Sequence, residues 1–332
     1  MYAKNPFSLK LVHPKYVVTW VGVFILFLLV QLPYKWQMWL GAFLGSNSRY
    51  FIKRRVSIIK RNLELCFPNK NKNEIDTLVN DNLKSLGIAL FETGIAWFWS
   101  DKKVKKLFQV KGMSNYLDAI AKNKGVIIVG VHFMSLELGG RIMGLCFPVN
   151  AMYRPHNNKA MEYIQTKGRC RSGKGMIDRK NLKFMVQELK SGKSIWFAPD
   201  QDFGRKGTIF APFFSVKNSS TSKGTSILAQ LSKSPTLTVT LLRNKSGANY
   251  DLVLGKEILE YPSSDALQDA TIINSILEVE IMKAPEQYLW AHRRFKTRPE
   301  GKCRFIASFI FILWHFKVYN KKRDKHMFYL VY

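Results

Sequence analysis

Two residues at a short spacing could perform acid–base chemistry. An apolar run at 125–130 leads into His132 and then Glu137, an H-x4-E pattern. One continuous helix would place these side chains about 140° apart. They meet only if His132 precedes a helix, Ser135 caps it and Glu137 lies in its first turns. The carboxylate would then orient His132 as a general base, although a purely structural hydrogen bond is the alternative.

A second apolar run, 194–198, is followed by Asp200. Open α/β sheets place their sites at such strand ends. Between the two runs lies a compact basic segment that contains Arg169 and Arg171. Arg169 could pair with Asp200 or bind an anionic group of a substrate through two parallel hydrogen bonds. Taken alone, each of these charged residues could instead simply be exposed to solvent, with no functional role.

The segment 285–298 is dense in basic and aromatic residues. Its composition suits recognition of phosphate or carboxylate at a membrane surface, and a nucleic-acid patch would have a similar composition. We expect the substrate to be bound by Arg171, Arg293, Arg294, Lys296 and Arg298.

Composition narrows the class of protein. The 332 residues carry a net charge of +29, which predicts an acidic partner such as an anionic membrane, an acidic protein, a phosphorylated substrate or nucleic acid. The four cysteines are far apart, which argues against a disulfide framework or a zinc site and fits a reducing compartment. The sequence contains neither a Walker A loop nor a GxGxxG fingerprint, so nucleotide chemistry has no support.

The elements that position these residues alternate in type. Short β-branched runs bounded by turn residues predict buried strands, and stretches with helical periodicity lie between them. This alternation predicts an α/β fold, a mixed sheet flanked by helices. The predicted strands are 125–130, 194–198, 235–242 and 250–254, and the predicted helices are 52–67, 73–99, 162–171, 179–189 and 265–284.

The N-terminal region contains an uncharged run of 17 residues, 16–32. This length predicts a transmembrane helix, with a buried core helix as the alternative. More basic residues follow the run than precede it, which places the body of the protein on the cytoplasmic side. Helix 52–67 has a basic face and could lie on anionic headgroups or be an ordinary surface helix. The expected organisation is a flank at 1–15, an anchor helix at 16–34, a catalytic domain at 35–301 and a basic and apolar extension at 302–332.

Six ordered motifs carry a resemblance to a known family. They are HFMSLE at 132–137, YRPHNN at 153–158, QTKGRCRS at 165–172, MIDRKNLK at 176–183, WFAPDQDFG at 196–204 and APEQYLWAHRRFKTRPEG at 284–301. Together they resemble the late acyltransferases of lipid A biosynthesis, and the resemblance extends over 6–301. The myristoyl-transferring members carry aspartate where Glu137 stands, so the resemblance favours the Kdo-dependent lauroyl and palmitoleoyl branch.

The resemblance implies a glycerolipid-acyltransferase-like sandwich behind a single-pass anchor in the inner membrane, with the catalytic domain on the cytoplasmic side. The enzyme would transfer a fatty acyl chain, lauroyl by expectation, from acyl carrier protein to a hydroxyl on an R-3-hydroxyacyl chain of Kdo2-lipid IVA. His132 and Glu137 match the catalytic pair of the family, and Arg169 and Asp200 match two further functional positions. The acyl carrier protein thioester is a co-substrate, and no metal or other cofactor is implied.

Three alternatives remain open from the sequence. The chain could be a palmitoleoyl- or myristoyl-specific member of the same family. It could be a glycerolipid acyltransferase, which would carry aspartate at the position of Glu137. A membrane-tethered basic protein that binds nucleic acid or anionic lipid would keep its function when His132 is replaced by alanine. We expect the partners to be acyl carrier protein, Kdo2-lipid IVA and the anionic inner membrane, and not nucleic acid.

Overall fold

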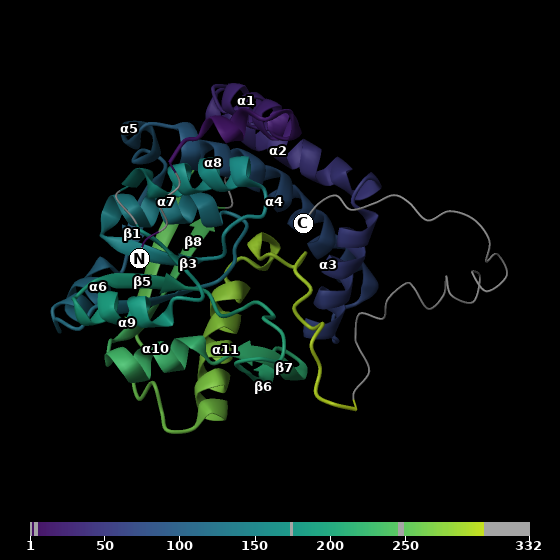
Figure 1. The fold of residues 1–332 in the computed structure, drawn as a ribbon. Helices are drawn as coiled ribbons and strands as arrows, with labels where there is room; N and C mark the ends of the chain where they lie inside the picture. The colour runs from purple at the N-terminus through teal and green to yellow at the C-terminus, as the bar shows by residue number, and fades with distance from the viewer. Residues whose placement is uncertain (1, 3–5, 173–174, 245–248, 302–332) are drawn as a thin grey trace, which may run out of the picture.

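A seven-stranded sheet runs through the centre of the molecule (Figure 1). The computed structural model describes residues 2, 6–172, 175–244 and 249–301. β8 and β9 pair antiparallel, and the other neighbouring strands pair parallel, so the predicted mixed sheet is confirmed. In spatial order the strands are β1 (Phe108–Lys111), β9 (Tyr250–Glu257), β8 (Thr236–Arg243), β2 (Val126–Gly130), β5 (Ser194–Phe197), β3 (Val149–Tyr153) and β4 (Met176–Asp178).

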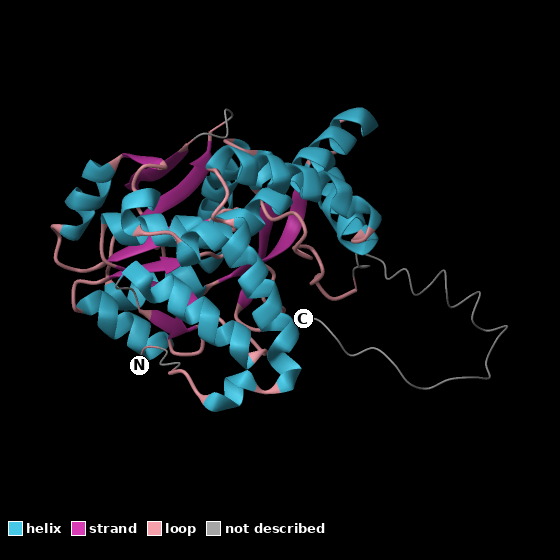
Figure 2. Cartoon of the chain, turned by 90° about the horizontal axis from the view of Figure 1, so that it is seen from above, coloured by secondary structure: helices cyan, strands magenta, loops and turns pink. Residues whose placement is uncertain are grey.

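Helices cover both faces of this sheet, as the view from above shows (Figure 2). In β2, Val126 and Ile128 pack into one hydrophobic core, and Ile127 and Val129 pack into a second core on the opposite face. The first face is covered by α6 (Met113–Ile120), α7 (Leu136–Cys146), α8 (Lys159–Arg169) and the C-terminal half of α4 (Lys72–Phe98). The second face is covered by α3 (Lys53–Cys66), α9 (Leu182–Lys190), α10 (Gly224–Ser232) and α11 (Ala266–Met282).

Two smaller features complete the described fold. A hairpin of β6 (Thr208–Phe213) and β7 (Val216–Ser222) packs against α11. The short helix α5 (Asp101–Val104) follows α4. α3 buries Ile59 and Leu63 completely, so its apolar side faces the protein core, as in an ordinary surface helix. The predicted extension 302–332 lies outside the described residues.

The structure does not support the predicted transmembrane helix at 16–34. The run folds as α1 (Val17–Leu29), then turns and continues as α2 (Tyr34–Asn47). At 1.5 Å per residue α1 is about 20 Å long, whereas the hydrocarbon core is about 30 Å thick. The buried Gln37 stabilises the turn by donating from Nε2 to the carbonyl oxygens of Val30 and Leu32, at 3.0 and 2.7 Å. Within the described part of the chain, no helix has both the length and the apolar character that a membrane crossing requires.

The α1–α2 hairpin is fixed to the domain by close packing. Glycines let α2 and α4 touch along their backbones, because a Cβ on Gly87 would overlap the carbonyl oxygen of Gly41. Trp99 donates from its indole N–H to the carbonyl oxygen of Val30 at 2.7 Å. Tyr34, the first residue of α2, donates to the hydroxyl of Tyr250 on β9 at 3.2 Å. The hairpin is therefore part of the first hydrophobic core.

Candidate active site

The carboxyl ends of β2 and β5 lie side by side in the sheet. The two strands are parallel neighbours, with Val129 opposite Phe197 in the register. Loops that leave adjacent parallel strands at one edge bring their first residues together, which is where open α/β sheets place their sites. His132 follows β2 by two residues and Asp200 follows β5 by three. The topology therefore brings these two residues together from positions 68 apart in the chain.

His132 and Asp200 form a close pair. Nδ1 of His132 lies 2.5 Å from Oδ1 of Asp200, and the backbone N–H of His132 donates to Oδ2 at 2.8 Å. A carboxylate on Nδ1 favours the tautomer that carries its proton there, so Nε2 keeps its lone pair. Burial acts to raise the pKa of Asp200, but the charge of His132 and these hydrogen bonds outweigh it and hold the pKa below its ordinary value. The arrangement is that of a general base with its orienting carboxylate.

Glu137 has a different partner from the one predicted. It lies in the first turn of α7, facing the end of α8, and its carboxylate binds Arg169 rather than His132. Nε of Arg169 donates to both carboxylate oxygens, at 3.0 and 3.1 Å, and the indole N–H of Trp97 donates to Oε2 at 3.0 Å. Burial acts to raise the pKa of Glu137, but the adjacent Arg169 holds it below its ordinary value. The alternative pairing of Arg169 with Asp200 does not occur either.

Both pairs border one cavity of about 680 Å³, within the usual range of ligand pockets. His132, Glu137 and Arg169 line it directly. Its lining contains both apolar and cationic side chains. The apolar lining includes Met143, Val149, Ala151, Met152, Met176, Trp196, Ala198 and Phe203, and the cationic lining includes Arg141, Arg154, Arg179 and Lys296.

Comparison with known proteins identifies the family. Residues 4–297 match the family model for bacterial lipid A biosynthesis acyltransferases. The chain belongs to this family. A lipid A biosynthesis palmitoleoyltransferase of Escherichia coli (strain K12) is 53% identical over 302 residues, which are 91% of this chain and 98% of that protein. A lipid A biosynthesis lauroyltransferase of the same strain is 44% identical over 295 residues, covering 89% and 96%. The chain is thus an enzyme, an acyltransferase of lipid A biosynthesis.

Of the five cations predicted to bind substrate, only Lys296 lines the cavity of this acyltransferase. Arg294 is buried, with its guanidinium 4.9 Å from the centre of the Phe213 ring and donating to the carbonyl oxygen of Ser220. Arg298 donates to the carbonyl oxygen of Asn218 at 2.7 Å. These two arginines hold β7 in place.

The other two predicted cations also lie outside the cavity lining. Arg171 donates to the carbonyl oxygen of Trp97 at 2.5 Å, which closes the C-terminal end of α4. Arg293 is half-buried beside the core arginine, Arg294. The basic composition of the two segments therefore did not distinguish the cation that lines the cavity from those that hydrogen-bond to backbone carbonyls.

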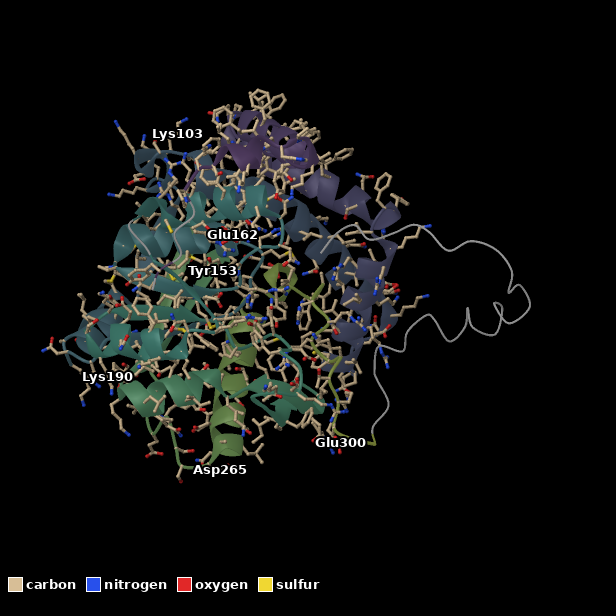
Figure 3. The ribbon with its side chains drawn as sticks, viewed as in Figure 1. Lys103, Tyr153, Glu162, Lys190, Asp265 and Glu300 are labelled. Atoms are coloured by element: carbon tan, nitrogen blue, oxygen red, sulfur yellow. The ribbon has the colours of Figure 1, made fainter. Side chains whose placement is uncertain are left out.

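Two residues of the acyltransferase that the sequence did not single out shape the cavity. Buried Glu162 on α8 accepts from the Tyr153 hydroxyl at 3.0 Å and from the backbone N–H of His156 at 2.6 Å, and so holds the loop of the YRPHNN motif (Figure 3). His292 lines the cavity and accepts from the backbone N–H of Asp202 at 3.2 Å. Burial lowers the pKa of His292 to about 4, so it is neutral at physiological pH. His292 lies within the motif at 284–301, and Glu162 follows the motif at 153–158 by four residues, so these motifs were the available signal.

Proposed function

We propose that this acyltransferase moves a fatty acyl chain from acyl carrier protein to a hydroxyl on an R-3-hydroxyacyl chain of Kdo2-lipid IVA, with His132 as the general base. One observation carries the proposal. The His132–Asp200 pair lies at a cavity lined by both apolar and cationic side chains, in a chain of the lipid A acyltransferase family. A hydroxylated, acylated and phosphorylated acceptor has the chemistry to fill such a cavity.

The reaction follows from the free Nε2 of His132. Nε2 takes the proton of the acceptor hydroxyl while the hydroxyl oxygen attacks the thioester carbonyl carbon. The carbonyl oxygen becomes an oxyanion, for which Arg169 or backbone N–H groups at the start of α7 would be the donors. Collapse of this intermediate breaks the carbon–sulfur bond, and the thiolate takes the proton back from Nε2. The products are an ester and a free thiol, and Asp200 stabilises the imidazolium formed between the two steps.

Glu137 and Arg169 have a second role in the proposal. Their ion pair joins the start of α7, next to His132, to the end of α8. Glu137 is thereby a positioning residue, which holds the guanidinium of Arg169 at the cavity wall. The side chains of Arg169 and Glu137 are 23% and 13% exposed, so removing one partner leaves the other charge with only partial compensation by solvent.

The cationic side chains of the cavity lining suit the anionic groups of the acceptor. Arg154 and Arg179 are exposed and Lys296 is half-exposed, and all three line the cavity. Among the described residues, none of the three has an acidic side chain within ion-pair distance. Guanidinium groups bind phosphate and carboxylate through paired hydrogen bonds. We assign Arg154, Arg179 and Lys296 to the phosphates and Kdo carboxylates of the acceptor.

The membrane partner is assigned to the outer surface of the α1–α2 hairpin. Large apolar side chains crowd this surface at the top of the molecule in the view of Figure 3, and Trp36 and Trp39 are 64% and 63% exposed. Exposed cations flank it, including Lys35, Arg49 and Lys53. Tryptophan and lysine at the edge of an apolar patch are typical of surfaces that enter the headgroup region of an anionic bilayer. The proposal places the protein on the cytoplasmic face of the inner membrane.

The test is acyl transfer by the purified protein in detergent. Kdo2-lipid IVA is offered with acyl carrier protein that bears lauroyl, myristoyl, palmitoyl or palmitoleoyl chains, and the lipid product is analysed by mass spectrometry. Wild type should add one acyl group, His132→Ala should add none, and His13→Ala, which changes an exposed histidine, should match wild type. The lauroyl donor predicted from the sequence competes here with palmitoleoyl, the donor in the name of the 53% identical relative. Absence of product with every donor, from folded wild type, would contradict the proposal and direct the search to glycerolipid acceptors.

A further inference from the structure

A strap of residues, 286–292, crosses the sheet edge where the catalytic loops emerge. On its outer side, two buried asparagines hold four of its carbonyl groups. Nδ2 of Asn82 on α4 donates to the carbonyl oxygens of Glu286 and Tyr288 at 2.9 and 2.8 Å. Nδ2 of Asn62 on α3 donates to the carbonyl oxygens of Trp290 and His292 at 2.7 Å each. The two amides thus bind every second residue along the strap.

The inner side of the strap bonds to the loop that carries His132. The backbone N–H of Leu289 donates to the carbonyl oxygen of His132 at 3.0 Å, and the N–H of Met134 donates to the carbonyl oxygen of Gln287 at 2.8 Å. Phe133 and Tyr288 form an antiparallel bridge between these bonds. The His132 backbone is therefore held from the strap on one side and by Asp200 on the other.

The strap also bonds to the loop that carries Asp200. The Tyr288 hydroxyl donates to the carbonyl oxygen of Asp200 at 3.4 Å, and Nε2 of His292 accepts from the N–H of Asp202 at 3.2 Å. Both members of the His132–Asp200 pair thus contact one strap, and that strap is fixed from behind by Asn62 and Asn82. A displaced strap would move both loops.

We infer that Asn62 and Asn82 are positioning residues for the His132–Asp200 pair, acting through the 286–292 strap. The inference rests on the proposed role of that pair. Both asparagines are buried, at 1% and 0% exposure, and neither Oδ1 atom has a hydrogen-bond partner among the described residues. A buried acceptor without a partner opposes folding. The function of each side-chain amide therefore lies in its Nδ2 group, which donates hydrogen bonds to two carbonyl oxygens.

The chain offers a matched control in Asn274. It is fully buried on α11, donates from Nδ2 to the carbonyl oxygen of Pro212 and the hydroxyl of Thr221, at 2.6 and 2.9 Å, and likewise has an Oδ1 without a partner among the described residues. Its donors hold the β6–β7 hairpin and not the strap. Asn274→Ala removes the same kind of buried bond as Asn62→Ala or Asn82→Ala, so a loss common to all three variants reports stability alone.

The first experiment measures acyl transfer at saturating and limiting substrate, together with the melting temperature of each variant. Asn62→Ala and Asn82→Ala should lower kcat about a hundredfold, as expected for a displaced reacting group. KM for donor and acceptor should stay within about threefold, because His292 is the one strap residue in the cavity lining. Asn274→Ala should lower the melting temperature to a similar extent and retain kcat. Wild-type kcat in both strap variants, or an equal loss of kcat in Asn274→Ala, would overturn the inference.

A second measurement needs no substrate. The far-downfield proton resonance of an Nδ1–H bound to a carboxylate reports the His132–Asp200 hydrogen bond, and His132→Gln assigns it. This resonance should be lost or broadened in Asn62→Ala and Asn82→Ala and retained in Asn274→Ala. If it persists unchanged in both strap variants, the positioning role is wrong. If wild type transfers no acyl group while the resonance responds as expected, the proposed function fails and the positioning role stands.

Discussion

His292 is a titratable residue of the cavity whose pKa is lowered by folding. It accepts a hydrogen bond from the N–H of Asp202, and burial lowers its pKa to about 4, against 6.5 for an ordinary histidine. Below pH 6.5 the unfolded chain therefore binds a proton that the folded chain does not. Stability is lost as pH falls from 6.5 to about 4, by roughly 3 kcal/mol.

This loss is measurable by urea unfolding between pH 7 and pH 4.5. Asp200 and Glu137 both have pKa values below their ordinary ones, so the stability they contribute is lost only at lower pH. His292→Gln keeps an acceptor without a proton to gain, and its free energy of unfolding should fall much less over this range than that of wild type. His13→Gln, at an exposed position, should follow wild type. If the free energy of unfolding of His292→Gln fell as steeply with pH as that of wild type, burial of His292 would not be the cause of the pH dependence.

The partners of the four site residues were only partly predictable. The sequence placed His132 and Asp200 at strand ends, and the structure confirms that placement. The H-x4-E spacing suggested a local pair, but Glu137 points to the end of α8 while Asp200 arrives from the next strand. His132 pairs with Asp200 because β2 and β5 are neighbours in the sheet. The sequences of the two strands contain no information on strand order. The catalytic roles of all four residues stay predictions.

At the scale of elements, the contact between α2 and α4 depends on glycine. A Cβ on Gly45 would overlap the carbonyl oxygen of Leu83, as one on Gly87 would overlap Gly41. Gly87→Ala should therefore force the two helices apart and destabilise the fold by about 1–3 kcal/mol. A Cβ on Gly22 of α1 would meet no atom within 4 Å, so Gly22→Ala should stabilise by up to about 1 kcal/mol through helix propensity. Thermal unfolding should show a lower melting temperature for Gly87→Ala and a higher one for Gly22→Ala. An unchanged melting temperature of Gly87→Ala would contradict the close contact between the helices.

Long periodic or fully buried elements were predictable, and short ones were not. The apolar runs at 125–130 and 194–198 form β2 and β5, which are buried along their whole length, and the helical pattern at 73–99 forms α4. β4 has three residues and β1 four, too few to show alternation. The run at 16–32 was apolar enough for a membrane span, yet its end folds back around Gln37, a contact that hydropathy does not encode.

At the scale of the whole molecule, the apolar hairpin surface and the cavity are linked through α8. Asn158, which caps α8, donates to the hydroxyl of Thr19 on α1 at 2.8 Å, and Arg169 at the other end of α8 lines the cavity. A membrane-bound hairpin would therefore hold the cavity at a fixed height above the lipid surface.

Vesicle co-sedimentation tests this arrangement. Trp36→Ser with Trp39→Ser should weaken binding to vesicles that contain anionic lipid by about tenfold or more, because two interfacial aromatic side chains are lost. High salt should weaken binding of wild type as well, since the flanking cations are screened. Leu259→Ser, an exposed apolar residue outside the hairpin, should bind as wild type does. Unchanged binding of the double variant would assign the surface to another partner.

The activity of Asp200→Asn tests the proposed catalytic mechanism most sharply. In this mechanism the His132–Asp200 pair is the general base of an acyl transfer in lipid A biosynthesis. The amide keeps the size of the side chain but removes the charge that fixes the histidine tautomer. The product of acyl transfer is measured by mass spectrometry, with thermal unfolding to show that the variant is folded and Asp76→Asn, in a partly exposed ion pair, as the control. We predict a loss in kcat of about a thousandfold or more with KM little changed, as in enzymes with comparable triads. A folded Asp200→Asn within tenfold of wild type would contradict the general-base role of the pair.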